Sequence, residues 1–360
     1  MTRSNARRVL NLVAAALVST ALGGARAAAQ ECNATTGSAP QSVILGPNGE
    51  QFYPQNTACP DQIVAPDCDG GITLHWKDPQ DPNGLMRYAC VASPPSSKPL
   101  PLVVFLHPSR IDTVDETFGG KPGGLPDTNL LSSASTAKIN PSVTGYVLLM
   151  PQGRCLTAPP TSSGNGVRFD VWYKDPQKNL DVRAVQQFIQ QLVTRKTLDA
   201  NGNPQDLPAT IATVDATREY LMGWSDGVYL AHFLALSFPD QFAAVATFAG
   251  ADPFSRDPCP TPYPTVDRKP PVMVVHSSCD PIELCSNVEG WFQALTKQGW
   301  PASALSDVIT DTTHTQIQKA CSQDSNVQQR SCPMAAHFVY ANPQLTTMFQ
   351  WLGQSTAKGK

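Results

Sequence analysis

A serine flanked by glycines is the part of this sequence best suited to do chemistry. Residues 223–227 read Gly-Trp-Ser-Asp-Gly; a strand-like stretch precedes them, and residues 228–238 carry apolar side chains at helical spacing. A serine on a sharp strand-to-helix turn is a nucleophile elbow, which holds the hydroxyl clear of the sheet. Larger flanking residues would collide with the neighbouring strand or helix. Ser225 is therefore the predicted nucleophile; the alternative is a turn in which the serine only caps the helix.

A serine hydroxyl is a weak nucleophile at neutral pH, so it needs a base, and the base needs a group to orient it. Where the serine lies on such an elbow, the acid and then the histidine follow it along the chain. Asp280 comes just after an apolar stretch and is the predicted acid, with Glu283 as the alternative. His337 directly precedes the last expected helix and is the predicted base, with His314 as the alternative.

The same chemistry needs two backbone N–H groups to stabilise an oxyanion. Asp226, directly after the serine, is expected to supply one of them. The second is expected from the loop after the first core strand, where Pro108 has no N–H and Ser109 is the predicted donor. In that loop His107 either binds substrate or shapes the backbone.

Three tryptophans could stack on an aromatic or polymeric substrate, although packing in the core is the competing interpretation for each. They are Trp172, Trp224 and Trp291.

Alternating apolar and helical segments indicate the fold that would position these residues. Strands are expected at residues 86–92, 102–106, 146–150, 220–222, 242–248, 272–276 and 304–310. Helices are expected at residues 181–195, 228–238, 287–298 and 345–352, the first of them capped by Asp181. This alternation predicts a doubly wound, mostly parallel sheet in a single α/β catalytic domain, the α/β-hydrolase arrangement.

Composition divides the 360-residue chain into three parts. Residues 1–29 combine a basic start, a short apolar stretch and small residues, which predicts a secretory signal peptide and an extracellular or periplasmic location, without a stable membrane anchor. Residues 30–85 are rich in turn-forming residues and read as a cysteine-stapled extension, with one strand near residues 71–76. Residues 86–360 form the expected catalytic domain.

Charge argues against nucleic acid as a partner. The net charge is −3, and removal of the arginine-bearing leader would make it −7, whereas nucleic-acid binding needs a basic face. The predicted serine chemistry needs no cofactor. The sequence contains no C-x2-C pair that would indicate a metal site. Oligomeric state does not follow from the sequence.

All ten cysteines lie after the predicted leader, and an even number in an exported chain indicates disulfides whose pairing stays open. Cys279 and Cys285 flank the predicted acid, while Cys321 and Cys332 bracket the segment before His337. We therefore expect a disulfide that links or braces the acid and base loops.

Several stretches together resemble the secreted polyhydroxybutyrate-depolymerase and feruloyl-esterase group of α/β-hydrolases. They are residues 99–107, 150–153, 169–172, 220–229 and 271–281. The resemblance implies hydrolysis of bulky or polymeric esters with Ser225, Asp280 and His337 as the triad. The chain has Pro108 where the group usually has glycine. A serine peptidase and a non-catalytic binding protein on the same fold remain the alternatives.

Overall fold

The computed structural model describes residues 65–68, 70–81, 86–109, 130–157, 165–256, 262–310, 332, 335–338 and 342–357. In this part of the chain the strands are β1 (Ile72–Lys77), β2 (Met86–Ala92), β3 (Leu100–Leu106), β4 (Val147–Pro151), β5 (Arg154–Thr157), β6 (Asn165–Arg168), β7 (Lys196–Leu198), β8 (Pro204–Asp206), β9 (Val214–Trp224), β10 (Phe242–Phe248), β11 (Val272–His276) and β12 (Leu305–Ile309). The helices are α3 (Leu130–Ser133), α4 (Leu180–Thr194), α5 (Asp226–Ser237), α6 (Cys285–Lys297), α9 (Ala335–Phe338) and α10 (Leu345–Gly353), with short 3-10 turns η1 (Pro253–Arg256), η2 (Ala302–Ala304) and η4 (Asn342–Gln344).

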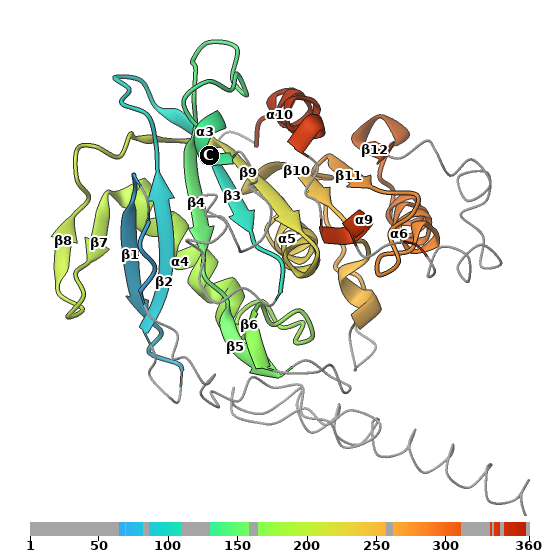
Figure 1. Ribbon diagram of the computed structural model, residues 1–360, viewed down its shortest axis with the longest axis horizontal. Helices are drawn as coiled ribbons and strands as arrows, with labels where there is room; N and C mark the ends of the chain where they lie inside the picture. Colours follow the sequence, from blue (N-terminus) through green and yellow to red (C-terminus); the bar gives the residue numbers. More distant parts are fainter. Residues whose placement is uncertain are drawn as a thin grey trace, which may run out of the picture.

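Ten strands form one twisted sheet in the order β12-β11-β10-β9-β3-β4-β2-β1-β7-β8 (Figure 1). The strands from β12 to β4 are parallel, and β2 pairs antiparallel with β4 at the next position. The order reverses around β3, which lies between β4 and β9 although it precedes both in sequence. This is the α/β-hydrolase fold, so the predicted fold class is confirmed. Among the described residues, no helix is long and apolar enough to cross a bilayer.

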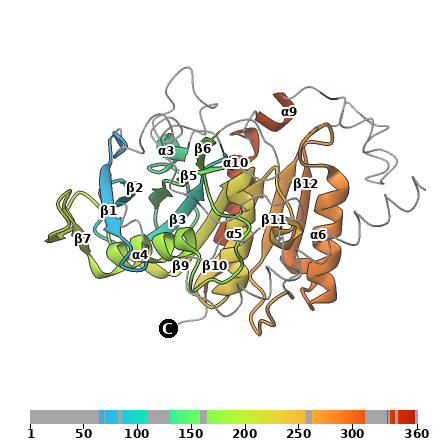
Figure 2. The same cartoon turned by 90° about the horizontal axis from the view of Figure 1, so that it is seen from below.

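Helices cover both faces of the central strands, which explains why these strands read as continuous apolar runs rather than alternating ones. Leu102 and Val104 of β3 pack with α4 and α5 on one face. Val103 and Phe105, which point the other way, pack with α3 and α10. Figure 2 shows the two helical layers on opposite sides of the sheet.

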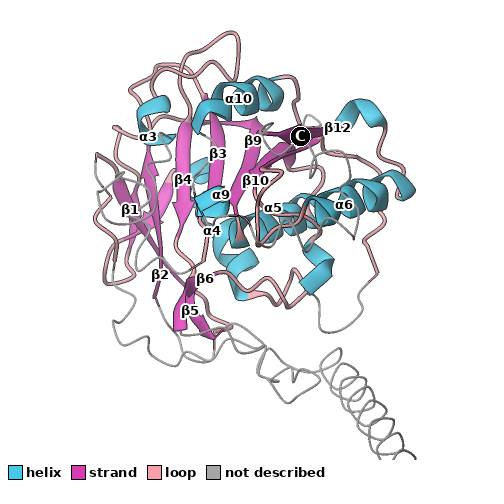
Figure 3. Cartoon of the chain, turned by 45° about the vertical axis from the view of Figure 1, so that its right-hand side comes forward, coloured by secondary structure: helices cyan, strands magenta, loops and turns pink. Residues whose placement is uncertain are grey.

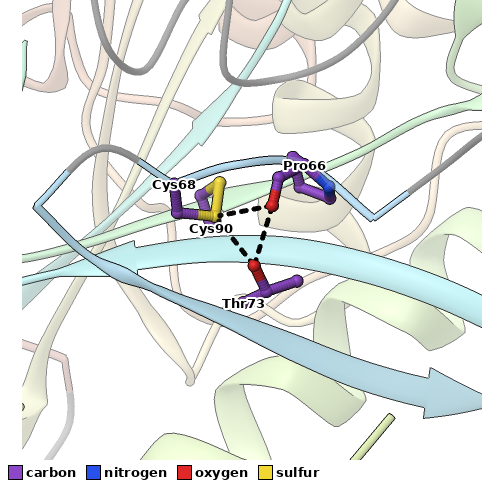
Figure 4. The surroundings of a disulfide bond; sticks show 4 residues. All are labelled: Pro66, Cys68, Thr73 and Cys90. Atoms are coloured by element: carbon purple, nitrogen blue, oxygen red, sulfur yellow. Dashed lines mark hydrogen bonds between the residues drawn. A yellow bond between two sulfur atoms is a disulfide. The ribbon is translucent and has the colours of Figure 1, made fainter.

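The segment before residue 86, expected to be an extension, contributes a strand to the sheet. β1 pairs antiparallel with β2 along its whole length. The disulfide Cys68–Cys90 joins the stretch just before β1 to β2, and Thr73 Oγ1 donates to the carbonyl of Pro66 at 2.9 Å beside it (Figure 4). The sheet therefore begins before the expected domain boundary. Residues 1–29 and Cys321 lie outside the described part.

Helix α4 begins one residue earlier than expected, and Asn179 rather than Asp181 caps it. The Asn179 side chain accepts from the backbone N–H groups of Asp181 and Val182 at 2.9 and 3.1 Å. The Asp181 side chain is thereby free to face the buried side of the helix.

Asp181 of α4 is the centre of a buried ion cluster with Arg87 of β2 and Arg154 of β5. Arg154 donates two hydrogen bonds to its carboxylate, at 3.2 and 3.1 Å, and Arg87 donates a third. All three side chains are buried. Burial on its own would raise the pKa of Asp181, but the charges of Arg154 and Arg87 outweigh it and lower the pKa to about 2.

Replacing Asp181 should destabilise the fold strongly. Asp181→Asn leaves Arg87 and Arg154 buried without their carboxylate, which we expect to lower the free energy of unfolding by about 3–5 kcal/mol. Because the folded pKa of Asp181 lies below its unfolded value, its stabilisation is present above about pH 4 and is lost as the pH falls toward 2. The free energy of unfolding, measured in urea, should therefore differ less and less between the wild-type and Asp181→Asn proteins as the pH falls from about 4 toward 2.

The exposed ion pair between Lys196 and Asp206 provides the control. Asp206→Asn should leave the unfolding midpoint unchanged at neutral pH, because exposed pairs contribute little. An Asp181→Asn protein as stable as the Asp206→Asn protein would contradict the cluster's role.

Candidate active site

The chain turns sharply at Ser225, between the end of β9 and the start of α5. Ser225 adopts φ 51° and ψ −117°, a conformation that side-chain-bearing residues rarely take. A Cβ on Gly223 would lie 2.6 Å from the carbonyl of Gly227, and one on Gly227 would lie 2.0 Å from that of Leu106. Both positions therefore need glycine. Ser225 itself remains partly exposed to solvent.

The structure brings Ser225, His337 and Asp280 together in one hydrogen-bonded chain. His337 Nε2 lies 2.8 Å from Ser225 Oγ, and His337 Nδ1 lies 2.7 Å from Asp280 Oδ2. A carboxylate only accepts hydrogen bonds, so its contact favours the tautomer with the proton on Nδ1. The lone pair of Nε2 then faces the serine hydroxyl, as proton abstraction requires.

Asp280 is held in place by the loop that carries it. Its second oxygen, Oδ1, accepts from the backbone N–H groups of Ile282 and Glu283, each at 2.8 Å. The Asp280 side chain has no exposed surface. Its orientation toward His337 therefore depends on the turn that follows β11.

The alternative acid makes a different contact. The Tyr229 hydroxyl donates to Glu283 Oε2, so this carboxylate ties the acid loop to α5. The alternative base, His314, lies outside the described residues.

His337 lies on the four-residue helix α9, which crosses in front of the central strands in Figure 3. Trp224 Nε1 donates to the His337 carbonyl at 3.1 Å. A disulfide between Cys279 and Cys332 joins the residue before Asp280 to the segment five residues before His337. The prediction of a disulfide between the acid and base loops is thereby confirmed. Cys285 is disulfide-bonded as well.

The expected oxyanion donors lie in segments that meet. β3 and β9 are parallel neighbours with Leu106 opposite Gly223, and the close approach of Gly227 to Leu106 brings the start of α5 against the end of β3. Ser109 follows three residues after Leu106, and Asp226 is the first residue of α5.

His107 lies behind this loop, not on the surface. Its Nδ1 lies 2.6 Å from the Pro108 carbonyl, and its Nε2 accepts from the backbone N–H of Gly153 at 2.9 Å. Burial lowers the pKa of His107 to about 4, so the ring is neutral at pH 7. With both nitrogens bonded to backbone and no exposed surface, His107 shapes the loop and is not placed to bind substrate.

The tryptophans considered for stacking are also buried. Trp224 has no exposed surface, Trp291 is 1% exposed and Trp172 is 6% exposed. None presents a ring face to solvent, so packing in the core accounts for them. The attraction of aromatic rings to both cores and binding surfaces is the reason that sequence could not separate the two.

Sequence reasoning missed how the loop at residues 169–173 is attached to the elbow. The carboxylate of Asp226 accepts from the backbone N–H of Phe169 at 3.1 Å. Asp170, whose pKa burial raises to about 6, accepts from the N–H groups of Trp172 and Tyr173, each at 3.1 Å. An aspartate directly after a predicted nucleophile was the available signal, because a buried carboxylate needs donors.

A cavity lined by described residues lies away from the triad. It has a volume of about 390 Å³ and lies beside the second half of α5, lined by Phe233, Leu236 and Lys174 among others. Ser225 precedes the first residue of that helix. The cavity is therefore at the opposite end of α5 from the triad.

No family model and no curated protein matches the chain. Solved structures with a similar arrangement include a thermostable esterase, at 18% identity and TM-score 0.45, covering 80% of this chain and 64% of that one. An acylaminoacyl peptidase from Pyrococcus horikoshii aligns at 13% identity and TM-score 0.44, covering 82% and 43%. An acetyl xylan esterase from Aspergillus awamori aligns at 14% identity and TM-score 0.42, covering 65% and 82%. The fold assignment rests on the sheet order and the elbow, not on these distant likenesses.

Breaking the Cys279–Cys332 disulfide should disable the site before it unfolds the protein. We expect Cys279→Ala with Cys332→Ala to lower kcat while near-UV circular dichroism still reports a folded core. The reason is that the bond restrains the short segment carrying His337, whereas the sheet does not depend on it. In a mild reductant, activity should likewise be lost before near-UV circular dichroism reports unfolding of the core.

The pair Cys68–Cys90 is the matched control, because it joins β2 to the segment before β1, at the antiparallel end of the sheet. Replacing it should lower thermal stability and leave kcat unchanged below the unfolding temperature. Parallel loss of activity and fold in the Cys279–Cys332 variant would show that the bond only supports overall stability.

Proposed function

We propose that the protein is a secreted serine carboxylic-ester hydrolase that acts on bulky or polymeric esters. The observation that carries this proposal is the hydrogen-bonded chain from Ser225 Oγ through the His337 ring to Asp280, built on a strained turn at which Ser225 is partly exposed. No binding role needs that arrangement, whereas acyl transfer needs all of it. A non-catalytic binding protein is therefore the weaker alternative.

In the proposed mechanism, His337 Nε2 takes the proton from Ser225 Oγ as the oxygen attacks the ester carbonyl carbon. Asp280 stabilises the imidazolium that forms and holds its orientation. The tetrahedral intermediate collapses when His337 returns the proton to the leaving alcohol, which leaves an acyl group on Ser225. Water, deprotonated by the same histidine, then attacks the acyl-enzyme and frees the acid. These steps need no cofactor.

The negative charge on the intermediate is stabilised, in this proposal, by the backbone N–H groups of Asp226 and Ser109. The meeting of β3 and α5 near Gly227 supports this pairing, because it brings the end of β3, three residues before Ser109, against the first turn of the helix that Ser225 precedes. The buried, neutral His107 supports it as well, since its two backbone contacts hold the loop before Ser109.

The substrate class rests on the resemblance of the sequence to polyhydroxyalkanoate depolymerases and feruloyl esterases. Peptide hydrolysis uses the same triad and is the alternative that a substrate comparison must exclude. Secretion is supported by the two disulfides of the described part, because such bonds persist mainly in oxidising compartments. The leader at residues 1–29 is part of this proposal, and so is the cysteine-stapled extension that begins at residue 30, although β1 within residues 30–85 belongs to the sheet.

Ser225→Ala should lower ester turnover about a millionfold, as removal of a triad serine does. Hydrolysis of p-nitrophenyl butyrate measures the change, and Ser237→Ala, at the other end of α5, is the control expected to keep full activity. The wild-type protein should form one covalent adduct with a fluorophosphonate, located at Ser225 by mass spectrometry. An unlabelled Ser225 would support the binding-protein alternative, and faster cleavage of peptide anilides than of short, feruloyl or polyhydroxybutyrate esters would support the peptidase.

The oxyanion donor can be removed without touching a side chain that reacts. Ser109→Pro deletes the backbone N–H, and we expect kcat to fall by about 10²–10³-fold, as it does when one such donor is lost. Ser109→Ala keeps the N–H and should keep the activity. Equal kcat values for the two variants, at matched unfolding temperatures, would exclude Ser109 as a donor.

A further inference from the structure

The indole ring of Trp224 is anchored far more firmly than its place in a variable position of the elbow motif would suggest. The ring has no exposed surface and packs in the core that contains α10, with its centroid 6.4 Å from that of Phe248. Phe248 is also its register partner across the parallel pair β9–β10. Such a ring cannot shift without repacking its neighbours.

The indole N–H points out of this core to the carbonyl oxygen of His337, at 3.1 Å. Buried tryptophans generally need a partner for this group, and here the partner is the backbone of the candidate base. The two residues are 113 positions apart in sequence.

His337 needs such a contact because its own helix cannot hold it. α9 has four residues, too few for a helix to be stable without tertiary support. The contacts of His337 include its two ring hydrogen bonds and the indole bond to its carbonyl. The ring bonds act at the end of a rotatable side chain, whereas the indole bond acts on the backbone.

We propose that Trp224 is a positioning residue for the base: its indole N–H holds the His337 backbone so that the imidazole stays in reach of Ser225. Ser225 directly follows Trp224, so the nucleophile and the support of its base belong to adjacent residues. A closed path runs from the Trp224 ring to the His337 carbonyl, through the imidazole to Ser225 Oγ, and back along one peptide bond. The distance from Nε2 to Oγ is thereby set within a small structural unit. This inference rests on the proposed function of the triad.

Trp300 offers a matched comparison. It is also buried, at 3% exposure, and its Nε1 donates to the backbone carbonyl of Pro270 at 2.9 Å. Pro270 precedes β11, whereas Asp280 follows it. The Trp300 bond therefore lies at the opposite end of this strand from the triad. Both tryptophans thus donate an indole N–H to a backbone carbonyl, and the two hydrogen bonds differ in where they lie relative to the triad.

The test compares Trp224→Phe with Trp300→Phe, each of which removes the indole N–H and leaves an aromatic ring. Both should lower the unfolding temperature to a similar degree. Only Trp224→Phe should lower kcat for p-nitrophenyl butyrate, by about 10-fold, because a small displacement of a catalytic group can cost up to about 100-fold. KM should stay at the wild-type value in both variants, since neither ring is exposed to substrate.

If phenylalanine at position 224 prevents folding, 3-benzothienylalanine at positions 224 and 300 replaces the indole N–H by sulfur and keeps the ring's shape. Wild-type kcat in a folded position-224 variant, or equal loss in both variants, would overturn the positioning role. Fluorophosphonate labelling of the wild-type protein separates the two proposals. A labelled Ser225 with an unaffected Trp224→Phe variant rejects only the positioning role, whereas an unlabelled Ser225 rejects the hydrolase itself.

Discussion

The 2.8 Å contact between Ser225 Oγ and His337 Nε2 is the interaction on which the rest of the site depends. It joins residues 112 positions apart, and neither end is stable on its own. Ser225 sits in a backbone conformation that is strained for a residue with a side chain, and His337 lies on a single helical turn. The surrounding structure must therefore over-determine both ends. It does so through close glycine contacts beneath the serine, and through an indole bond and a disulfide around the histidine.

Three buried carboxylates each hold a different part of the structure in place. Asp181 neutralises Arg87 and Arg154, Asp226 holds the loop that begins at Phe169, and Asp280 orients the base. Each of these carboxylates accepts hydrogen bonds, which lower the free-energy cost of burying it. Ser225, by contrast, remains partly exposed, whereas Asp280 and His337 are buried.

Much of this frame could be predicted from local patterns. The central strands 102–106, 242–248 and 272–276 are apolar on both faces, and only a sheet covered by helices on both sides accommodates such runs. At the antiparallel end of the sheet, the sequence predicted fewer of the strands that the structure contains. β7 and β8, each three residues long, have no pattern of their own, and β1 belongs to the sheet only through its pairing with β2. The cap of helix α4 is Asn179 and not the predicted Asp181. Both residue types cap helices equally well, and only the packing shows which of the two side chains faces the interior.

Sequence by itself determined the identity of the elbow and the order in which a serine, an acid and a histidine follow one another. It did so because a turn with two tight backbone approaches admits few residue types, and because strand and helix periodicities are local properties. Tertiary structure alone decided which acid faces the histidine, that His107, Trp172 and Trp224 are buried rather than exposed, and that the Trp224 indole reaches His337. These are contacts between segments tens to more than a hundred residues apart, and no local pattern records which of several chemically equivalent side chains the packing of the sheet and its helices will bring together.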